Sequence, residues 1–368
     1  MKKLTAVSLA TIFLLGACQT PSLKEQSIEP TKQANAKNVS ATANTSNGAI
    51  LRYDIVHHPV IAKYGMVASQ NYLATEVGRD ILAGGGNAVD SAIAVGFALA
   101  VTLPRAGNIG GSGFMLIHMA GAEDTIALDF RSAAPELAQL SDFKDENGKI
   151  DWFTMSFGAK APGVPGSVAG LYRAWEMHGS LPWKSLLAPA IKLARDGIQV
   201  TEDLSFALQE AEALMLKYPS SSKAYLTKEG KAPAAGEILV QNDLVWSLTE
   251  IAEHGADAFY RGAIAQKIED YMQVADGYIS KRDLGAYKVE QRKAISTQFN
   301  GYKVVTMPPV SGGGIAMLQI LNVLSEFPMS SYAAGSADSL HVIAETMKRV
   351  AANRRVSIGD PDFVDVPT

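Results

Sequence analysis

The sequence predicts a layered fold of helices and strands, of the α/β or α+β class. Segments with helical and with strand-like patterns alternate along the chain, and no internal repeat is present. The chain has 368 residues, 47% of them hydrophobic and 19% charged, which is enough for one large domain or two ordinary ones with a sizeable core. Periodicity alone leaves open whether the sheet is doubly wound or stacked between helices.

The N-terminus has the organisation of a secretory signal. Two lysines precede a short apolar run, residues 4–15, which is too short to span a bilayer by itself. The sequence Leu-Gly-Ala-Cys that ends at Cys18 resembles a bacterial lipobox, in which the cysteine is lipidated and becomes the mature N-terminus. We therefore expect a signal peptide over 1–17 and lipidation of Cys18; a plain cleaved signal with a chance cysteine is the alternative.

A polar segment follows the signal. Residues 18–49 are poor in aromatic residues and predict a flexible, lipid-anchored linker, so that the folded domain is expected over 50–368. Gln19, in place of Asp, follows the sorting pattern of outer-membrane lipoproteins in Gram-negative bacteria. We thus expect an exported protein on the periplasmic face of the outer membrane, which contacts the membrane only through its lipid.

The folded part is expected to open with two helices. Helical spacing of apolar residues predicts the first over 73–83, ended by Gly84–Gly86. Asn87 is placed to cap the second, 88–101, which is apolar on nearly all sides. A membrane span is the rival interpretation of that segment. It is short and carries Asp90, so we expect a core helix packed on both sides.

A glycine-rich loop and a hairpin come next. The β-type runs 114–120 and 125–131 flank four residues that fit a hairpin turn, and pairing about that turn places Arg131 opposite Phe114, beside the loop 107–113. The loop has no Gly-Lys-Ser/Thr and follows a helix rather than a strand, so it does not match nucleotide-binding fingerprints. We expect a tight turn with positive φ that lets helix and strand pack closely.

The rest of the chain alternates similarly. A helix opens at Gly163–Gly170, a strand is expected over 301–307, and further helices are expected over 186–195, 203–217, 243–254, 258–274, 315–324 and 338–350. The segment Pro308–Gly314 lies between strand and helix. It either offers amides to an anion at the helix start or, stiffened by two prolines, shapes a wall.

Several functions are disfavoured by composition and spacing. The net charge is −4 and no basic stripe exists, so no nucleic-acid partner is expected. The histidines show no metal-binding spacing, so no metal is predicted. Ser220 to Lys223 matches Ser-x-x-Lys, but Pro219 precedes it and no Lys-Thr-Gly occurs, which favours a chance match.

Arg131 is the residue that points to chemistry. A surface ion pair is the usual fate of an arginine. Arg131 instead follows Asp129 and Phe130 at a strand end beside a glycine loop, where a guanidinium can fork onto a carboxylate.

The order of these motifs closely resembles the bacterial γ-glutamyltransferases, which are N-terminal-nucleophile hydrolases. The opening segment Gly65–Pro135 carries the resemblance, and further segments follow in family order: Pro162–Gly170, Leu193–Gly197, Phe259–Gly262, Asp283–Leu284 with Tyr287, and Gly359–Val364. The resemblance covers nearly everything over 65–367. It implies an α+β fold, the four-layer αββα sandwich, present here incompletely as the large-subunit part.

The resemblance also implies a chemistry without cofactors. The family precursor, a zymogen, cuts itself into a large and a small subunit, and a threonine at the new N-terminus opens γ-glutamyl amides such as glutathione. The glutamyl group then passes to water or to an amino acid or peptide. Arg131 stands where the family arginine grips the substrate α-carboxylate. The nucleophilic threonine is expected beyond Thr368, so we expect no catalytic residue here, no activity of this chain alone, and the small subunit as its partner.

Five positions depart from the family pattern. Ser112 replaces a glycine, Ser132 stands where glutamate is frequent, Val310 and Gly312 change a Pro-Pro-Pro-Ser-Ser-Gly-Gly loop, and Asn353 stands where aspartate is common. These departures bear on specificity rather than on the fold. Two alternative functions therefore stay open: a related acylase that cleaves glutaryl or other amides, and a non-catalytic lipoprotein that uses the fold to bind a ligand.

Overall fold

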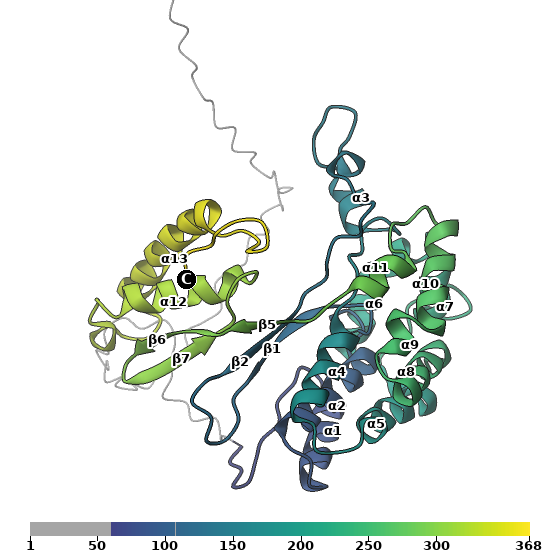
Figure 1. Cartoon of the computed structure of the whole chain (residues 1–368), viewed down its shortest axis with the longest axis horizontal. Helices are drawn as coiled ribbons and strands as arrows, with labels where there is room; N and C mark the ends of the chain where they lie inside the picture. The colour runs from purple at the N-terminus through teal and green to yellow at the C-terminus, as the bar shows by residue number, and fades with distance from the viewer. Residues whose placement is uncertain (1–59, 107) are drawn as a thin grey trace, which may run out of the picture. The chain divides into compact units, whose positions relative to one another are not determined.

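Helices and small antiparallel sheets are mixed in the computed structural model of the protein, which confirms the predicted α+β class (Figure 1). The structure describes residues 60–106 and 108–368, which belong to one compact unit. The predicted signal peptide over 1–17, the lipidation of Cys18 and the linker over 18–49 lie outside the described residues.

A bundle of helices forms the main core. Its helices are α1 (Tyr72–Ala83), α2 (Ala88–Thr102), α4 (Ser167–His178), α5 (Trp183–Asp196) and α8 (Asn242–His254). Helix α2 packs against α1, α4 and α5 and buries eleven of its fifteen residues, which confirms a core helix over a membrane span. A side chain at Gly78 would lie 2.5 Å from Val95, so glycine is what lets α1 approach α2 this closely.

The start of α2 follows the predicted cap. Asn87 accepts from the backbone N–H of Asp90, and Asp90 accepts in return from the N–H of Asn87, which closes a capping box. Asp90 is fully buried and also accepts hydrogen bonds from Ser180 and Leu181. The carboxylate therefore ties the start of α2 to the turn that precedes α5.

A three-stranded antiparallel sheet carries the predicted hairpin. It has the order β1 (Gly113–Ile117), β2 (Ile126–Phe130) and β5 (Glu290–Lys293). The predicted register was wrong by two residues: Phe114 pairs with Asp129, and Arg131 lies beyond the end of β2. The strands end earlier than predicted, and a turn between Met119 and Ala122 closes the hairpin, with Gly121 at φ 77°.

The other elements flank these two groups. They are α3 (Trp152–Ser156), α6 (Glu202–Met215), α7 (Pro219–Tyr225), α9 (Asp257–Tyr260), α10 (Ala263–Val274), α11 (Lys281–Ala286), the 3₁₀ turns Leu140–Phe143 and Met329–Ser331, and the strand pairs β3 (Ile198–Gln199) with β4 (Ile238–Leu239) and β6 (Ile295–Phe299) with β7 (Tyr302–Thr306). The single helix predicted over 258–274 was wrong. Gly262 interrupts it, since its N–H turns back to the carbonyl of Asp257.

The last helices pack on the β6–β7 pair. Helix α12 (Gly312–Leu324) contacts β6, β7 and α13 (Ala337–Ser357). It starts three residues earlier than predicted, so the triple glycine is helical, and α13 runs seven residues further than predicted. A side chain at Gly314 would lie 1.9 Å from the carbonyl oxygen of Met307, so the helix start sits directly on the strand end.

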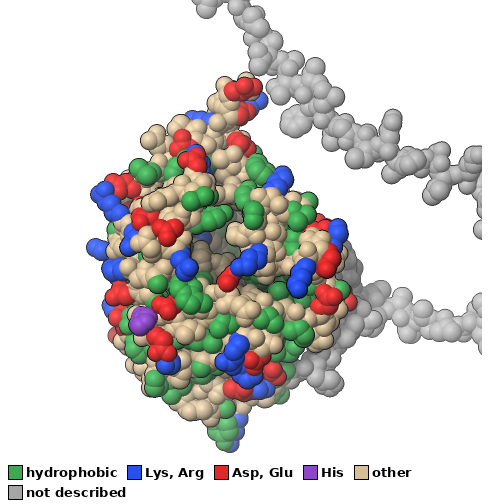
Figure 2. Space-filling model, turned by 90° about the vertical axis from the view of Figure 1, so that its right-hand side faces the viewer, with side chains coloured by type: hydrophobic (Ala, Val, Ile, Leu, Met, Phe, Trp, Pro, Cys, Tyr) green, Lys and Arg blue, Asp and Glu red, His purple; other side chains and the backbone are tan. Residues whose placement is uncertain are grey.

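On the face shown in Figure 2, basic and acidic side chains are interspersed, and neither charge predominates. None of the helices over 60–106 and 108–368 has both the length and the apolar character that crossing a bilayer requires.

Candidate functional site

Arg131 lines the cavity that we take as the candidate site. The cavity has a volume of about 760 Å³ and is bounded by the end of β2, the segment 132–136, α11, β5 and the acidic turn at Asp360 and Asp362. The exposed guanidinium donates to Ser112 (Nη1–Oγ 3.4 Å) and lies 6.0 Å from the ring of Phe114. Within the described residues, it forms no ion pair with an aspartate or glutamate.

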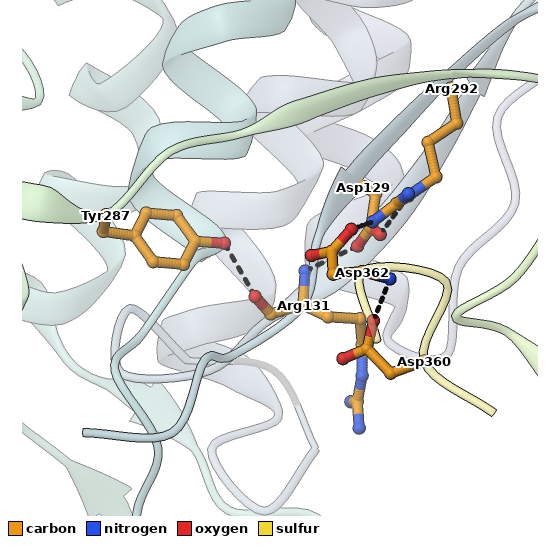
Figure 3. A network of polar contacts seen from close by, with 6 residues as sticks. All are labelled: Asp129, Arg131, Tyr287, Arg292, Asp360 and Asp362. Carbon is orange, nitrogen blue, oxygen red and sulfur yellow. Dashed lines mark hydrogen bonds and ion pairs between the residues drawn. The ribbon is translucent and has the colours of Figure 1, made fainter. Parts of the chain in front are cut away.

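The backbone of Arg131 is held on both sides (Figure 3). Its N–H donates to Asp129 (N–Oδ1 3.0 Å), and its carbonyl oxygen accepts from the hydroxyl of Tyr287 (2.8 Å). Because the residue follows a strand end, these bonds replace the ladder that would otherwise fix it. The side chain of Arg131 therefore projects from a fixed backbone.

Asp129 is itself paired. It is only 5% exposed, and Arg292 donates to it from the neighbouring strand (Nε–Oδ2 2.7 Å). Arg292 pairs with Ala127 across the sheet, so Asp129 is its diagonal neighbour on the same face. Burial alone would lower the pKa of Arg292, but the hydrogen bond and charge of Asp129 outweigh burial and raise it. Arg292 also approaches Asp362 (Nη2–Oδ1 3.7 Å).

Tyr287 rests on a second tyrosine. Its ring stacks on Tyr260, with centroids 5.6 Å apart and planes inclined by 12°. The hydroxyl of Tyr260 donates to the carbonyl of Pro165 (2.8 Å) and accepts from the N–H of Ala169 (3.2 Å). Burial, more than any neighbouring charge, raises the pKa of both tyrosines, so both hydroxyls stay protonated at neutral pH.

Gly166 allows the close contact between the start of α4, the end of β2 and Tyr287. A Cβ atom there would lie 2.0 Å from the carbonyl oxygen of Phe130 and 2.1 Å from the hydroxyl of Tyr287. The start of α4 can therefore lie directly against the end of β2 only because residue 166 has no side chain.

The glycine-rich loop packs against the start of α4 as well. The carbonyl of Gly111 accepts from the N–H groups of Gly166 (2.9 Å) and Ser167 (3.0 Å). These amides are thus engaged with the protein rather than offered to a phosphate. The predicted close packing is present, but the predicted positive φ was wrong for the described glycines of the loop, Gly110, Gly111 and Gly113.

Three of the five departures from the family pattern lie beside Arg131 or in the wall of the cavity that it lines. Ser112 contacts the guanidinium, and Ser132 and Val310 line the cavity wall. Gly312 instead lies against Arg354 in the α12–α13 pair, and Asn353 donates to Gln319 there.

Other sequence candidates lie elsewhere. Lys223 of the Ser-x-x-Lys match pairs with Asp243 rather than with a serine. In the described part of the chain, no three His, Cys, Asp or Glu side chains are grouped so as to hold a metal ion.

The sequence did not reveal Arg292 as a member of the site. Its strand, Glu290–Lys293, consists of polar and charged residues and shows no apolar alternation. A usable signal was the buried Asp129 itself, since a carboxylate in a predicted strand needs a cationic or hydrogen-bonding partner.

The similarity to known proteins extends over most of the chain. Residues 74–368 match the family described as Gamma-glutamyltranspeptidase. The Glutathione hydrolase proenzyme of Escherichia coli (strain K12) is 48% identical over 312 residues, which cover 85% of this chain and 54% of that protein. The Acylase ACY 1 proenzyme of Pseudomonas sp. (strain SE83) is 35% identical over 322 residues, covering 84% and 56%. The chain therefore spans about half the length of these curated relatives.

The fold agrees with a solved structure of the same family. The crystal structure of Helicobacter pylori gamma-glutamyltranspeptidase matches with a TM-score of 0.82 and 41% sequence identity, covering 84% of this chain and 88% of that chain.

Proposed function

The chain belongs to the γ-glutamyltranspeptidase family, and we propose that it supplies the carboxylate-binding side of an enzyme that opens γ-glutamyl amides of the glutathione type. The observation that carries this proposal is Arg131, an exposed guanidinium in a cavity, without an acidic partner among the described residues and with its backbone held on both sides. A guanidinium placed in this way suits a planar carboxylate, which it can bind through two parallel hydrogen bonds.

The proposed reaction is an acyl transfer. The hydroxyl of an N-terminal threonine attacks the γ-amide carbonyl while the threonine amine takes up the proton, and the leaving amine is protonated as the C–N bond breaks. The glutamyl ester then passes to water or to an amine. Arg131 would bind the α-carboxylate throughout, with a contribution of about 1.5–3 kcal/mol for hydrogen bonds to a charged group.

We propose that the threonine belongs to a small subunit cut from the same precursor, and that this chain has no turnover alone. The lengths of the relatives support this division: the chain covers 54% of the Escherichia coli proenzyme but 88% of the solved Helicobacter pylori chain. Apolar side chains left exposed on α12 and α13, such as Met317 and Met347, also support a further polypeptide there.

The deciding experiment removes the guanidinium. In the mature two-subunit enzyme, we expect Arg131→Ala to lower kcat/KM for γ-glutamyl-p-nitroanilide about ten- to a hundredfold. The anilide of 4-aminobutyrate lacks the α-carboxylate and should be hydrolysed equally by parent and variant. Arg173→Ala, which removes an exposed arginine on α4 that pairs with Glu176 in the described part of the chain, is the matched control. An unchanged kcat/KM for the γ-glutamyl anilide in Arg131→Ala would remove Arg131 from the substrate site.

A related acylase is the second candidate, favoured by the similarity to the Pseudomonas acylase. Glutaryl-p-nitroanilide keeps the carboxylate but lacks the α-amine. A preference for it over the γ-glutamyl anilide would favour the acylase function. Binding of glutamate with no turnover of either anilide by the assembled protein would favour a non-catalytic role.

We also propose that the protein is exported and anchored through lipid on Cys18, at the periplasmic face of the outer membrane. The lipobox-like sequence at the N-terminus supports this proposal. Labelling with an alkyne fatty acid should be lost in Cys18→Ser, and labelling that persists would refute the assignment.

A further inference from the structure

We propose that Tyr287 and the Asp129–Arg292 pair are positioning residues that aim the Arg131 guanidinium and thereby set the preference for substrates with an α-carboxylate. The inference rests on the proposed function and deepens it, since it concerns the same cavity.

In the described part of the chain, the Arg131 side chain has few contacts of its own. Beyond the end of β2, its guanidinium has one long hydrogen bond to Ser112 (3.4 Å) and lies 6.0 Å from the ring of Phe114. Among the described residues, no carboxylate fixes it. The direction in which it projects therefore depends on the conformation of its backbone.

Both backbone groups of Arg131 are held by side chains. The N–H donates to Asp129 (3.0 Å) and the carbonyl accepts from Tyr287 (2.8 Å). The two groups come from different elements, since Asp129 lies in β2 and Tyr287 follows α11. Figure 3 shows them approaching Arg131 from opposite sides.

Asp129 and Tyr287 are each held in place by a neighbouring side chain. Asp129 is buried and accepts a hydrogen bond from Arg292 (2.7 Å). Tyr287 stacks on Tyr260, whose hydroxyl donates to the carbonyl of Pro165. Displacement of a binding group by about 1 Å can cost up to about a hundredfold in rate. Loss of the Tyr287 hydroxyl, which leaves the stacking on Tyr260 in place, is thus expected to act on substrate binding more than on folding.

The test removes one oxygen atom. Tyr287→Phe keeps the ring that stacks on Tyr260 and deletes only the donor to Arg131. In the mature enzyme we expect kcat/KM for γ-glutamyl-p-nitroanilide to fall about three- to thirtyfold, mainly through KM. The 4-aminobutyrate anilide, which has no α-carboxylate for Arg131 to bind, should be unaffected.

Tyr278→Phe is the matched control, since that hydroxyl donates to Asp142 (2.7 Å) away from the cavity. It should leave both anilides unchanged. Arg292→Gln should repeat the selective loss, and Arg292→Lys, which keeps the charge beside Asp129, should recover part of it.

The outcomes separate the two proposals. Equal losses with both anilides in Tyr287→Phe would indicate a general structural role and overturn the inference, as would no loss with either. If Arg131→Ala itself leaves the γ-glutamyl anilide unaffected, the proposed function fails, whatever the tyrosine variant does.

Discussion

Helices α2 and α12 are similarly apolar, yet they lie in different surroundings. Eleven of the fifteen residues of α2 are buried, against four of the thirteen residues of α12. Helix α2 is enclosed by α1, α4 and α5, whereas α12 contacts α13 and the β6–β7 pair. An apolar sequence therefore indicates a helix that must be buried, but not how much of its surface the same chain buries.

The N-termini of α2 and α12 also differ in how they are stabilised. Helix α2 begins at a closed capping box of Asn87 and Asp90. The residue before helix α12, Ser311, makes no side-chain cap hydrogen bond, and the helix packs onto the end of β7 through Gly314. The first start is stabilised by its own side chains and the second by a close backbone contact.

The largest expected effect comes from one core ring in α2. Phe97 is 1% exposed and meets the edge of Trp183, so Phe97→Ala should cost about 3–5 kcal/mol of unfolding free energy. Met317→Ala in α12, where the side chain is 40% exposed, should cost less than about 1 kcal/mol. Urea unfolding of the full chain, followed by circular dichroism, measures both. Equal costs would mean that α12 is as well covered in solution as α2.

A smaller effect is expected from the buried carboxylate of α2. Burial alone would raise the pKa of Asp90, but hydrogen bonds from Ser180, Asn87 and Leu181 outweigh burial and lower it. Asp90→Asn should therefore cost about 1–3 kcal/mol at pH 7.

The pH dependence of that cost follows from the sign of the shift. Because the folded pKa lies below the unfolded value of about 3.9, the stabilisation is complete at neutral pH and is lost as the pH falls through the folded pKa. Urea unfolding from pH 7 to pH 3 should show a constant difference between parent and Asp90→Asn down to about pH 4, then a shrinking one. A difference that persists undiminished at acid pH would assign the effect to shape rather than charge.

The smallest effects concern the caps. Asn87→Ala should cost about 1 kcal/mol, because two backbone N–H groups at the start of α2 lose their acceptor. Ser311→Ala should be nearly neutral, since no cap bond is lost. Thermal melts of the two variants and the parent measure both costs, and a larger loss in Ser311→Ala would show that the start of α12 depends on its side-chain cap more than the start of α2 does.

The sequence predicted those features that short-range patterns mark. The first two helices were placed to within a residue because Asn87 and the glycines at 84–86 mark their ends in sequence. The hairpin was found but its register was not, since a turn from Met119 to Ala122 sets the pairing, whereas the sequence suggested a turn over residues 121–124. Strand β5 was missed because its pairing with β2 depends on a segment more than 150 residues away.

The same limit applied to the site. Arg131 could be placed beside the glycine-rich loop from its position in the chain, and its contact with Ser112 agrees with that placement. Tyr287 was visible only as part of a motif, and Arg292 was not visible at all. Both meet Arg131 or Asp129 through tertiary packing, which no local pattern encodes.

The missing side chain at Gly166 has a consequence for anyone who would redesign the pocket. Even a methyl group there would clash with both Tyr287 and the end of β2 and would push them apart. A library that varies the cavity rim can range widely over Ser132 or Val310, but it must hold this hidden position constant. A change there would redirect the arginine without ever touching it.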